Sequence, residues 1–269
     1  MKGLLLPSCL VLLLLISGCV HDPGPSKTAA AMNITPEEAL ARLDRRDQER
    51  DLLTAVAEAT VNTENGRYPL RLAILAAVPA SLRLEAIPVI GLPNFFLAGH
   101  AGRLAVYLPG NGEYYTGAAG PDNLARFFPL PLSVGDLVSL LRGRRPALPA
   151  AAKPLQIEGF PEGGTYRLNI VSQDRQFRQS LWIDPETGYL HRCEQEGKGS
   201  PGLLNVYFEA YAPVAGAELP HRMRVKITGK EEITVTWEYE SLTLEKLNTD
   251  REELFTLPAP PGVRVIHLD

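Results

Sequence analysis

Apolar and polar side chains alternate with a period of two residues along several stretches of this 269-residue chain. The most regular stretch places Ile233, Val235, Trp237 and Tyr239 between threonines and glutamates. Segments with the same pattern are 70–77, 82–85, 166–170, 177–183, 204–209 and 222–227. Such alternation gives each strand one apolar and one polar face, which is typical of an antiparallel sheet covered on one side. We therefore expect a mainly β (α+β) fold in which roughly ten strands form one curved sheet.

Two short helical segments interrupt the series of strands. The first spans residues 121–128, and the second follows a capping box at residues 133–136 and ends before Gly143. Because both are apolar and are inserted into a one-sided sheet, we expect them to lie across its concave, apolar face. The residues that we expect to form this lid are Leu124, Phe127, Phe128, Leu137, Leu140 and Leu141.

The N-terminus has the features of a bacterial lipoprotein signal. Lys2 precedes an apolar run over residues 4–16 that is too short to span a bilayer, and Ser17 and Gly18 precede Cys19. Cleavage before Cys19 would leave its thiol for diacylglyceryl modification, and two or three acyl chains hold a protein stably on a membrane. The alternatives are an ordinary signal peptide with a chance cysteine and an uncleaved anchor.

The chain accordingly divides into three segments. Residues 1–18 are the expected signal peptide, and residues 19–34 are a lipidated tether rich in Pro, Gly and Ala. Thr35 and Glu38 form a capping box that begins a helix, so we expect one folded domain over residues 35–269.

Composition and charge exclude several classes of function. The chain carries 27 Lys and Arg against 31 Asp and Glu, whereas a general nucleic-acid binder needs a basic face. Of its three cysteines, Cys9 lies in the signal segment and Cys19 in the lipid site, so Cys193 has no internal disulfide partner. We expect Cys193 to be a small buried residue of a strand rather than a catalytic thiol.

Sequence motifs for catalysis or metal binding are missing. The histidines lack metal-ligand spacing, and the chain contains no G-x-S-x-G, S-x-x-K or Walker motif. We therefore expect a protein that is not an enzyme and that needs no cofactor or metal.

The segment Ile-Pro-Val-Ile-Gly-Leu-Pro-Asn-Phe-Phe-Leu at residues 87–97 is unusual in being both apolar and rich in breakers. Its two prolines and Gly91 prevent a regular strand, so it must be a loop. Two interpretations remain open: a loop folded back into the core, or a hydrophobic protrusion that contacts lipid or a partner. The residues that the second interpretation assigns to membrane contact are Val89, Ile90, Leu92, Phe95 and Phe96.

The order of these features carries a family resemblance. A lipobox, a helix and paired strands are followed by Pro-Val-Ile-Gly-Leu at 88–92, Phe-Pro-Leu-Pro-Leu-Ser at 128–133 and a helix ending in Leu-Arg-Gly-Arg-Arg-Pro at 141–146. In this order, and in its later strands, the chain resembles the outer-membrane lipoprotein receptor LolB, its soluble relative LolA and LolB-like lipoproteins. The resemblance covers most of residues 37–245. The longer C-terminal segment, 248–269, is closer to LolA-like proteins.

This resemblance implies an unclosed half-barrel of roughly eleven strands, with helices as a lid over a hydrophobic cavity. It implies a monomer that accepts lipoprotein acyl chains from a periplasmic LolA-like carrier and passes the cargo to the membrane. Val20 after the anchor, under the enterobacterial sorting rule, favours the periplasmic face of the outer membrane. In LolB an apolar loop between early strands is needed for the last step, and Val89, Ile90 and Leu92 occupy the matching place.

The alternative is a structural or adaptor lipoprotein of the envelope, with the same half-barrel but a filled core. The observation that distinguishes the two is the interior, because several hundred Å³ of enclosed apolar space would favour a carrier.

Overall fold

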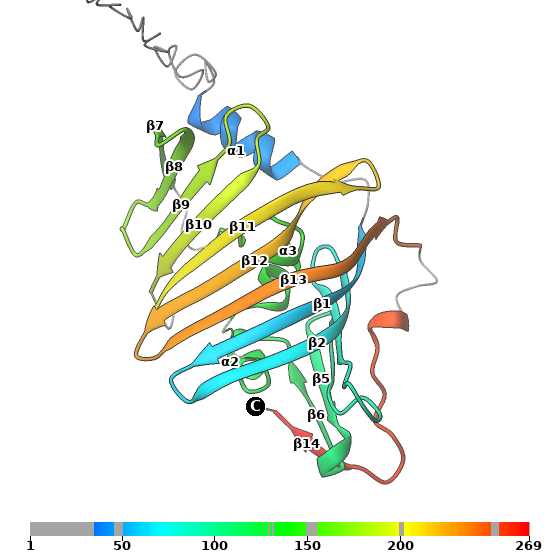
Figure 1. Cartoon of the computed structure of the whole chain (residues 1–269). Helices are drawn as coiled ribbons and strands as arrows, with labels where there is room; N and C mark the ends of the chain where they lie inside the picture. The colour runs from blue at the N-terminus through cyan, green and yellow to red at the C-terminus, as the bar shows by residue number, and fades with distance from the viewer. Residues whose placement is uncertain are drawn as a thin grey trace, which may run out of the picture.

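The computed structural model describes residues 35–45, 51–128, 130, 132–148, 155–198, 202–248 and 253–268. Within these ranges the chain forms one sheet of 14 strands with short helices beside it (Figure 1). The predicted signal peptide, the tether and Cys19 lie outside the described residues.

The first half of the sheet is a meander of six strands that follow one another in the chain. They are β1 (Leu52–Thr63), β2 (Gly66–Ala77), β3 (Ser81–Ala86), β4 (Phe96–His100), β5 (Arg103–Leu108) and β6 (Glu113–Ala118), with a 3-10 turn, η2 (Pro109–Asn111), before β6. All neighbours in this half are antiparallel.

The second half is a meander of seven strands. They are β7 (Leu155–Glu162), β8 (Thr165–Ser172), β9 (Phe177–Ile183), β10 (Leu190–Gly197), β11 (Gly202–Val214), β12 (Ala217–Gly229) and β13 (Glu232–Glu245). The last of them, β13, pairs antiparallel with β1 and thereby joins the two halves. The short strand β14 (Arg264–His267) adds to β6 in parallel, so the sheet has β14 at one edge and β7 at the other.

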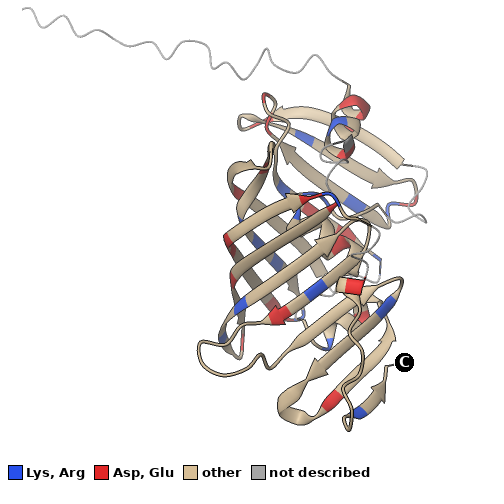
Figure 2. Ribbon diagram, turned by 90° about the vertical axis from the view of Figure 1, so that its right-hand side faces the viewer, with Lys and Arg blue, Asp and Glu red and all other residues tan. Residues whose placement is uncertain are grey.

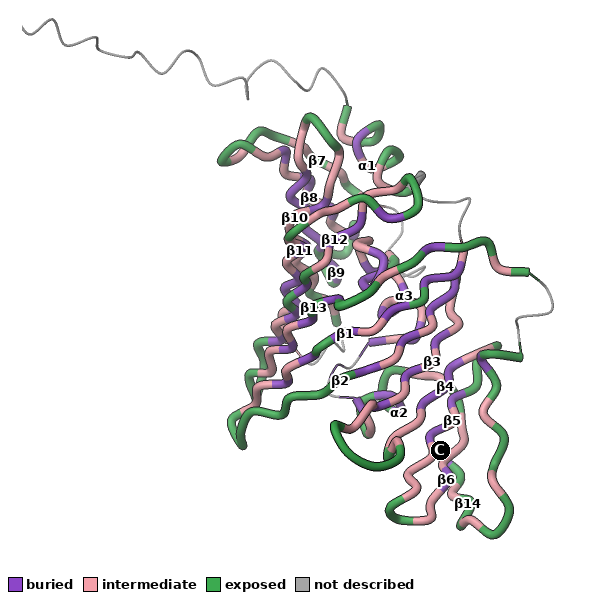
Figure 3. Tube along the Cα trace, turned by 45° about the vertical axis from the view of Figure 1, so that its right-hand side comes forward, coloured by how far each residue is buried: buried purple, intermediate pink, exposed green. Residues whose placement is uncertain are grey.

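The predicted class is confirmed as one large, curved and unclosed sheet, but the strand count is higher than expected. Two strands explain part of the difference because they do not show the expected burial pattern. In β4 the consecutive residues Leu97, Ala98 and Gly99 are all buried, and in the edge strand β7 no residue is fully buried. Figure 3 shows the regular alternation of buried and more exposed residues in the longer strands.

The helices are α1 (Pro36–Arg45), α2 (Pro121–Ala125) and α3 (Val134–Leu141). The capping box of α1 is present, since Glu38 N donates to Thr35 Oγ1 at 3.2 Å and Thr35 N donates to Glu38 Oε2 at 2.9 Å. Ser133 caps α3 by accepting a hydrogen bond from Asp136 N at 3.0 Å. Helix α2 is shorter than the predicted 121–128. After it, Phe127 N donates to Leu124 O in a bond of the 3-10 type, and Phe128 N donates to the same oxygen.

The C-terminal segment is fastened to the first half of the sheet. Phe255 is buried beside Leu52 and Ala77 in a small second core. Arg83 Nη1 donates to the carbonyl oxygens of residues 254 and 256 at 3.1 and 3.2 Å. Tyr114 Oη donates to Leu257 O at 2.7 Å, after which the chain continues into β14.

Candidate functional site

The helices between the two meanders lie within the curve of the sheet (Figure 1). Five of the six predicted lid residues are buried, and the sixth, Phe127, is half-buried. Phe128 packs on Trp237 with a ring-centroid distance of 5.6 Å, and Phe127 meets the edge of Tyr115 at 4.9 Å. The helices therefore cover the apolar face of the sheet, as the sequence indicates.

The lid residues pack directly on that face. They belong to the same buried cluster as the apolar strand residues, including Trp237 and Phe208. Tyr239 Oη donates to Leu141 O at 2.8 Å, and Arg142 Nη1 donates to Asp51 O at 3.1 Å, which ties the end of α3 to the sheet. Burial raises the pKa of the Tyr239 hydroxyl. The described side chains of these helices therefore fill part of the concave face.

The apolar loop protrudes from the sheet. Its tip residues Val89, Ile90 and Leu92 are 100%, 91% and 88% exposed. The base is fixed by backbone hydrogen bonds from Ala86 N to Phe95 O at 3.0 Å and from Ile87 N to Arg71 O at 2.7 Å. The loop therefore presents three large apolar side chains to solvent from a fixed base.

The two phenylalanines assigned to the same contact lie elsewhere. Phe95 packs against the main core, and Phe96 begins β4, where its ring stacks on Tyr107 at 5.9 Å. Both sit at the base of the loop, Phe95 directly before β4 and Phe96 as its first residue. We therefore restrict the candidate contact to Val89, Ile90 and Leu92.

A cavity of about 310 Å³ lies at the other end of the lid, between α1, the end of α3 and strands β10 to β12. Its lining combines arginines, carboxylates and apolar side chains. The lining residues are Leu43, Asp44, Ser139, Arg142, Gly143, Arg144, Arg145, Ala147, Leu148, Leu190, Tyr211 and Glu218. The Arg-rich run at 142–145 has no functional signature in the sequence alone, since only the fold brings it together with α1 and β10 to β12.

The polar face of the second meander carries a row in which arginines and aromatic rings alternate across the strands. From β7 to β12 the members are Phe160, Arg167, Trp182, Arg192, Tyr207 and Arg224. The distances from guanidinium carbon to ring centroid lie between 4.5 and 5.6 Å, within the range of cation–π attraction.

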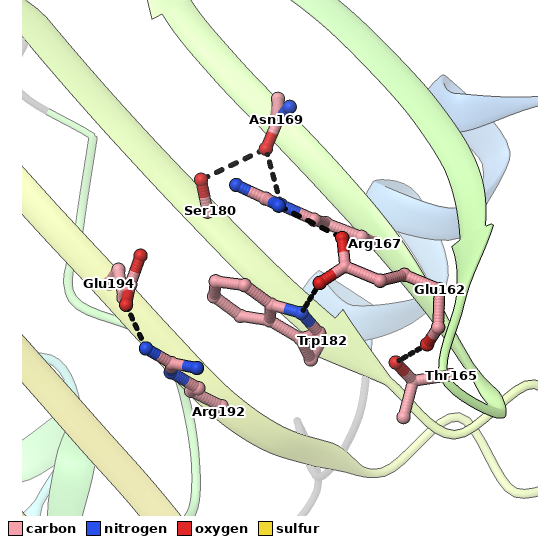
Figure 4. A network of polar contacts seen from close by, with 8 residues as sticks. All are labelled: Glu162, Thr165, Arg167, Asn169, Ser180, Trp182, Arg192 and Glu194. Atoms are coloured by element: carbon pink, nitrogen blue, oxygen red, sulfur yellow. Dashed lines mark hydrogen bonds and ion pairs between the residues drawn. The ribbon is translucent and has the colours of Figure 1, made fainter.

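Carboxylates neutralise this row (Figure 4). Glu162 accepts hydrogen bonds from Arg167 at 2.9 Å and from Trp182 Nε1 at 3.2 Å, and Arg192 is paired with Glu194. The hydrogen bonds from Arg167 and Trp182 lower the pKa of Glu162. Basic and acidic residues are also interspersed along the other strands (Figure 2). This face is therefore a solvated sheet surface on which side chains of neighbouring strands are joined by ion pairs and cation–π contacts.

Cys193 is the free cysteine among the described residues. Cys193 is fully buried, and desolvation raises the pKa of its thiol to about 12, which suits the expected buried strand residue. No group of three or more His, Cys, Asp or Glu among the described residues could hold a metal ion. No described helix has the length and apolar character needed to cross a membrane.

Three solved structures have a fold similar to that of this chain. A LolA superfamily protein from Nitrosomonas europaea superposes with a TM-score of 0.56 at 13% identity, covering 83% of this chain and 98% of its own. A DUF1329 family protein from Desulfovibrio piger gives 0.57 at 14% identity, over 82% and 98% of the two chains. A putative outer membrane lipoprotein-sorting protein domain from Vibrio parahaemolyticus gives 0.52 at 16% identity, over 81% and 95%.

The protein therefore has a LolA-like half-barrel fold. No family model matches the sequence, and no curated protein is significantly similar to it. The resemblance to LolA-type proteins is thus confirmed for the fold, and the resemblance to LolB in particular stays a prediction.

Proposed function

We propose that this protein is a lipid-anchored carrier at the periplasmic face of the outer membrane, which holds acyl chains against its concave face and passes lipoprotein or lipid cargo to the membrane. The observation that carries the proposal is the apolar loop tip, where Val89, Ile90 and Leu92 stand in solvent on a fixed base. Exposed apolar side chains that cluster in this way mark contact surfaces. A predicted lipid anchor at Cys19 would keep that tip close to a bilayer.

The energetics of such a transfer need no nucleotide or metal. Each buried methylene is worth about 0.8 kcal/mol, so exposing an acyl chain of roughly fourteen carbons to water costs on the order of 11 kcal/mol. A protein site that covers the chain removes most of this cost. Transfer from one apolar site to another, and then to a bilayer, is therefore close to isoenergetic.

Loading requires a movement of the lid, because its residues already occupy the concave face. The end of α3 is tied to β13 and to the chain before β1 by the bonds of Leu141 O and Arg142 described above. By contrast, Phe127 after α2 is only half-buried. We assign the opening to the α2 side, where acyl chains would replace the contacts of Phe127 and Phe128.

The packed interior favours a second candidate, a structural or adaptor lipoprotein. In that case the cluster of lid and strand residues is a permanent core, and the loop tip contacts a protein instead of lipid. The two candidates differ in whether the protein takes up acyl chains at all.

The substitution Leu92→Glu tests the carrier. Leu92 is 88% exposed, so a glutamate there should leave the melting temperature nearly unchanged. It should also leave the binding of a fluorescent acyl probe unchanged. Moving that carboxylate toward the acyl region of a bilayer costs several kcal/mol, so delivery of cargo to liposomes should slow by about tenfold or more.

A matched control is Leu254→Glu, which places the same charge on another exposed leucine, 39% exposed, in the C-terminal segment. It should deliver cargo at the rate of the wild-type protein. Equal delivery by the Leu92 and Leu254 variants would contradict the membrane-contact role of the loop. A protein that binds no acyl probe in any form would favour the adaptor.

A further inference from the structure

The arginine-lined cavity at the end of α3 has the character of an anion site. Its lining contains three guanidinium groups, from Arg142, Arg144 and Arg145, against the two carboxylates of Asp44 and Glu218. Asp44 already forms a bidentate pair with Arg145 Nη2, at 2.9 Å to each oxygen. The lining as a whole therefore carries a net positive charge in a chain whose net charge is −4.

We propose that this cavity binds the phosphate ester of an anionic lipid and so holds the headgroup of the cargo. The proposal rests on the carrier function above and adds the headgroup to its acyl-chain site. Arginine suits this task because its planar fork of donors matches phosphate oxygens in pairs. A guanidinium group has five donor hydrogens, so it can keep its protein contacts and still donate to a ligand.

The burial of the arginines strengthens the case. Arg142 is only 3% exposed, and the side chain of Arg145 is 11% exposed. Charges held away from water attract a ligand more strongly than surface charges, since the effective dielectric is lower. A charged headgroup entering this cavity would exchange its hydration for fixed donors.

The remaining walls suit the part of a lipid next to its phosphate. Leu43, Leu148 and Leu190 contribute aliphatic surface, and Tyr211 contributes part of its side chain. Tyr211 is held in place, because its hydroxyl donates to Leu190 O at 2.7 Å and its ring stacks on Tyr189 at 4.6 Å. Apolar walls beside a cationic lining select an amphiphile over a simple ion.

The end of α3 does not oppose an anion as strongly as a bare helix terminus would. In the last turn of the helix, the carbonyl oxygens of Ser139 and Leu140 accept hydrogen bonds from the backbone N–H groups of residues 142 to 144, and Leu141 O accepts one from Tyr239 Oη. The partial negative charge of the terminus is therefore largely covered. The same bonds hold the backbone of Arg144 whatever side chain it carries, which makes Arg144 the residue to substitute.

Native mass spectrometry tests the proposal. The protein is purified in detergent, the detergent is removed in the instrument, and short-chain phosphatidylglycerol is the probe. Arg144→Gln should weaken binding by about tenfold, the loss expected for a charge-assisted hydrogen bond. Arg144→Lys should restore a large part of the affinity. Glu218→Gln should strengthen the binding of phosphatidylglycerol but not of diacylglycerol, because it removes a negative charge from the lining.

Arg178→Gln is the matched control, because Arg178 is an exposed arginine of β9, outside the cavity. Short-chain diacylglycerol has the same acyl chains without the phosphate, and its binding should be unaffected by Arg144→Gln. Equal affinity for phosphatidylglycerol and diacylglycerol would overturn the headgroup site and leave the carrier function intact. Failure of both lipids to bind would count against the carrier itself.

Glycerol phosphate distinguishes the two sources of a phosphate ester. It should bind much more weakly than phosphatidylglycerol, since it lacks the part that contacts the apolar walls. Equal affinity for the two would overturn a lipid as the ligand and indicate a site for small soluble phosphates.

Discussion

Gly143 shows how closely the end of α3 fits against the sheet. Its φ of +69° lies in the left-handed region, and an added Cβ would come within 2.6 Å of Pro220 Cδ in β12. Gly143→Ala should therefore lower the free energy of unfolding by about 1–2 kcal/mol from the backbone conformation, and further because of the contact with Pro220. Urea denaturation of the two proteins measures this difference.

Gly102 provides the matched control. Its φ is +74°, and an added Cβ would meet nothing within 4 Å. Gly102→Ala should therefore cost only the backbone part. Equal losses for the two substitutions would show that α3 has room to shift away from β12, against the close packing described above.

At the scale of elements, the inserted helices differ in how firmly they are built into the core. Leu140 in α3 is fully buried, whereas Phe127 after α2 is half-buried. Leu140→Asp should destabilise the fold by several kcal/mol, because it buries an unpaired charge. Phe127→Asp should be tolerated better and should instead weaken the binding of an acyl probe. Thermal melts and probe displacement on both variants separate the two effects.

Ala125→Asp is the control for Phe127, since Ala125 is the exposed last residue of α2. It should bind the acyl probe with the same affinity as the wild-type protein. A folded Phe127→Asp protein with unchanged affinity would remove this side of the lid from the acyl site.

The elements also show how far the sequence determines the structure. Long strands such as β13 follow directly from alternation, because one face is buried along most of their length. The helix caps at Thr35 and Ser133 follow from local hydrogen bonding and are present. Strand β4 could not be predicted from alternation, because it buries consecutive small and apolar residues.

Placement in space is the part that the sequence could not supply. The loop tip is equally apolar whether it faces the core or solvent, so residue types alone left both interpretations open. The direction of the loop depends on where β2 and β4 fix its base. The arginine cavity likewise needs α1 and strands β10 to β12 in place, which are distant from residues 142–145 in the chain.

At the scale of the whole molecule, the proposed function depends on attachment through Cys19. Cys19→Ala should give a folded protein that is no longer labelled by palmitate in growing cells and no longer sediments with membranes. The reason is that the cysteine thiol is the acylation site, while the predicted tether separates it from the domain. Metabolic labelling followed by cell fractionation measures both properties.

Cys193→Ala is the control, because that thiol is fully buried in β10. It should keep the label and the membrane fraction. Palmitate labelling that persists in Cys19→Ala would show that the protein is not lipidated at this residue.

The two meanders of the sheet meet along one seam, the pairing of β1 with β13. Every other antiparallel pair joins strands that are consecutive in the chain, whereas this seam aligns Leu52 with Glu245 and Asn62 with Thr234. Most strand pairing is therefore local, and the loop-closure entropy of the architecture is concentrated in two long-range steps, this seam and the parallel pairing of β14 with β6. The lid helices belong to the stretch of chain that the seam encloses. Their contacts with both halves, such as Phe128 with Trp237 and α3 with β3, can offset that entropy once the seam has formed.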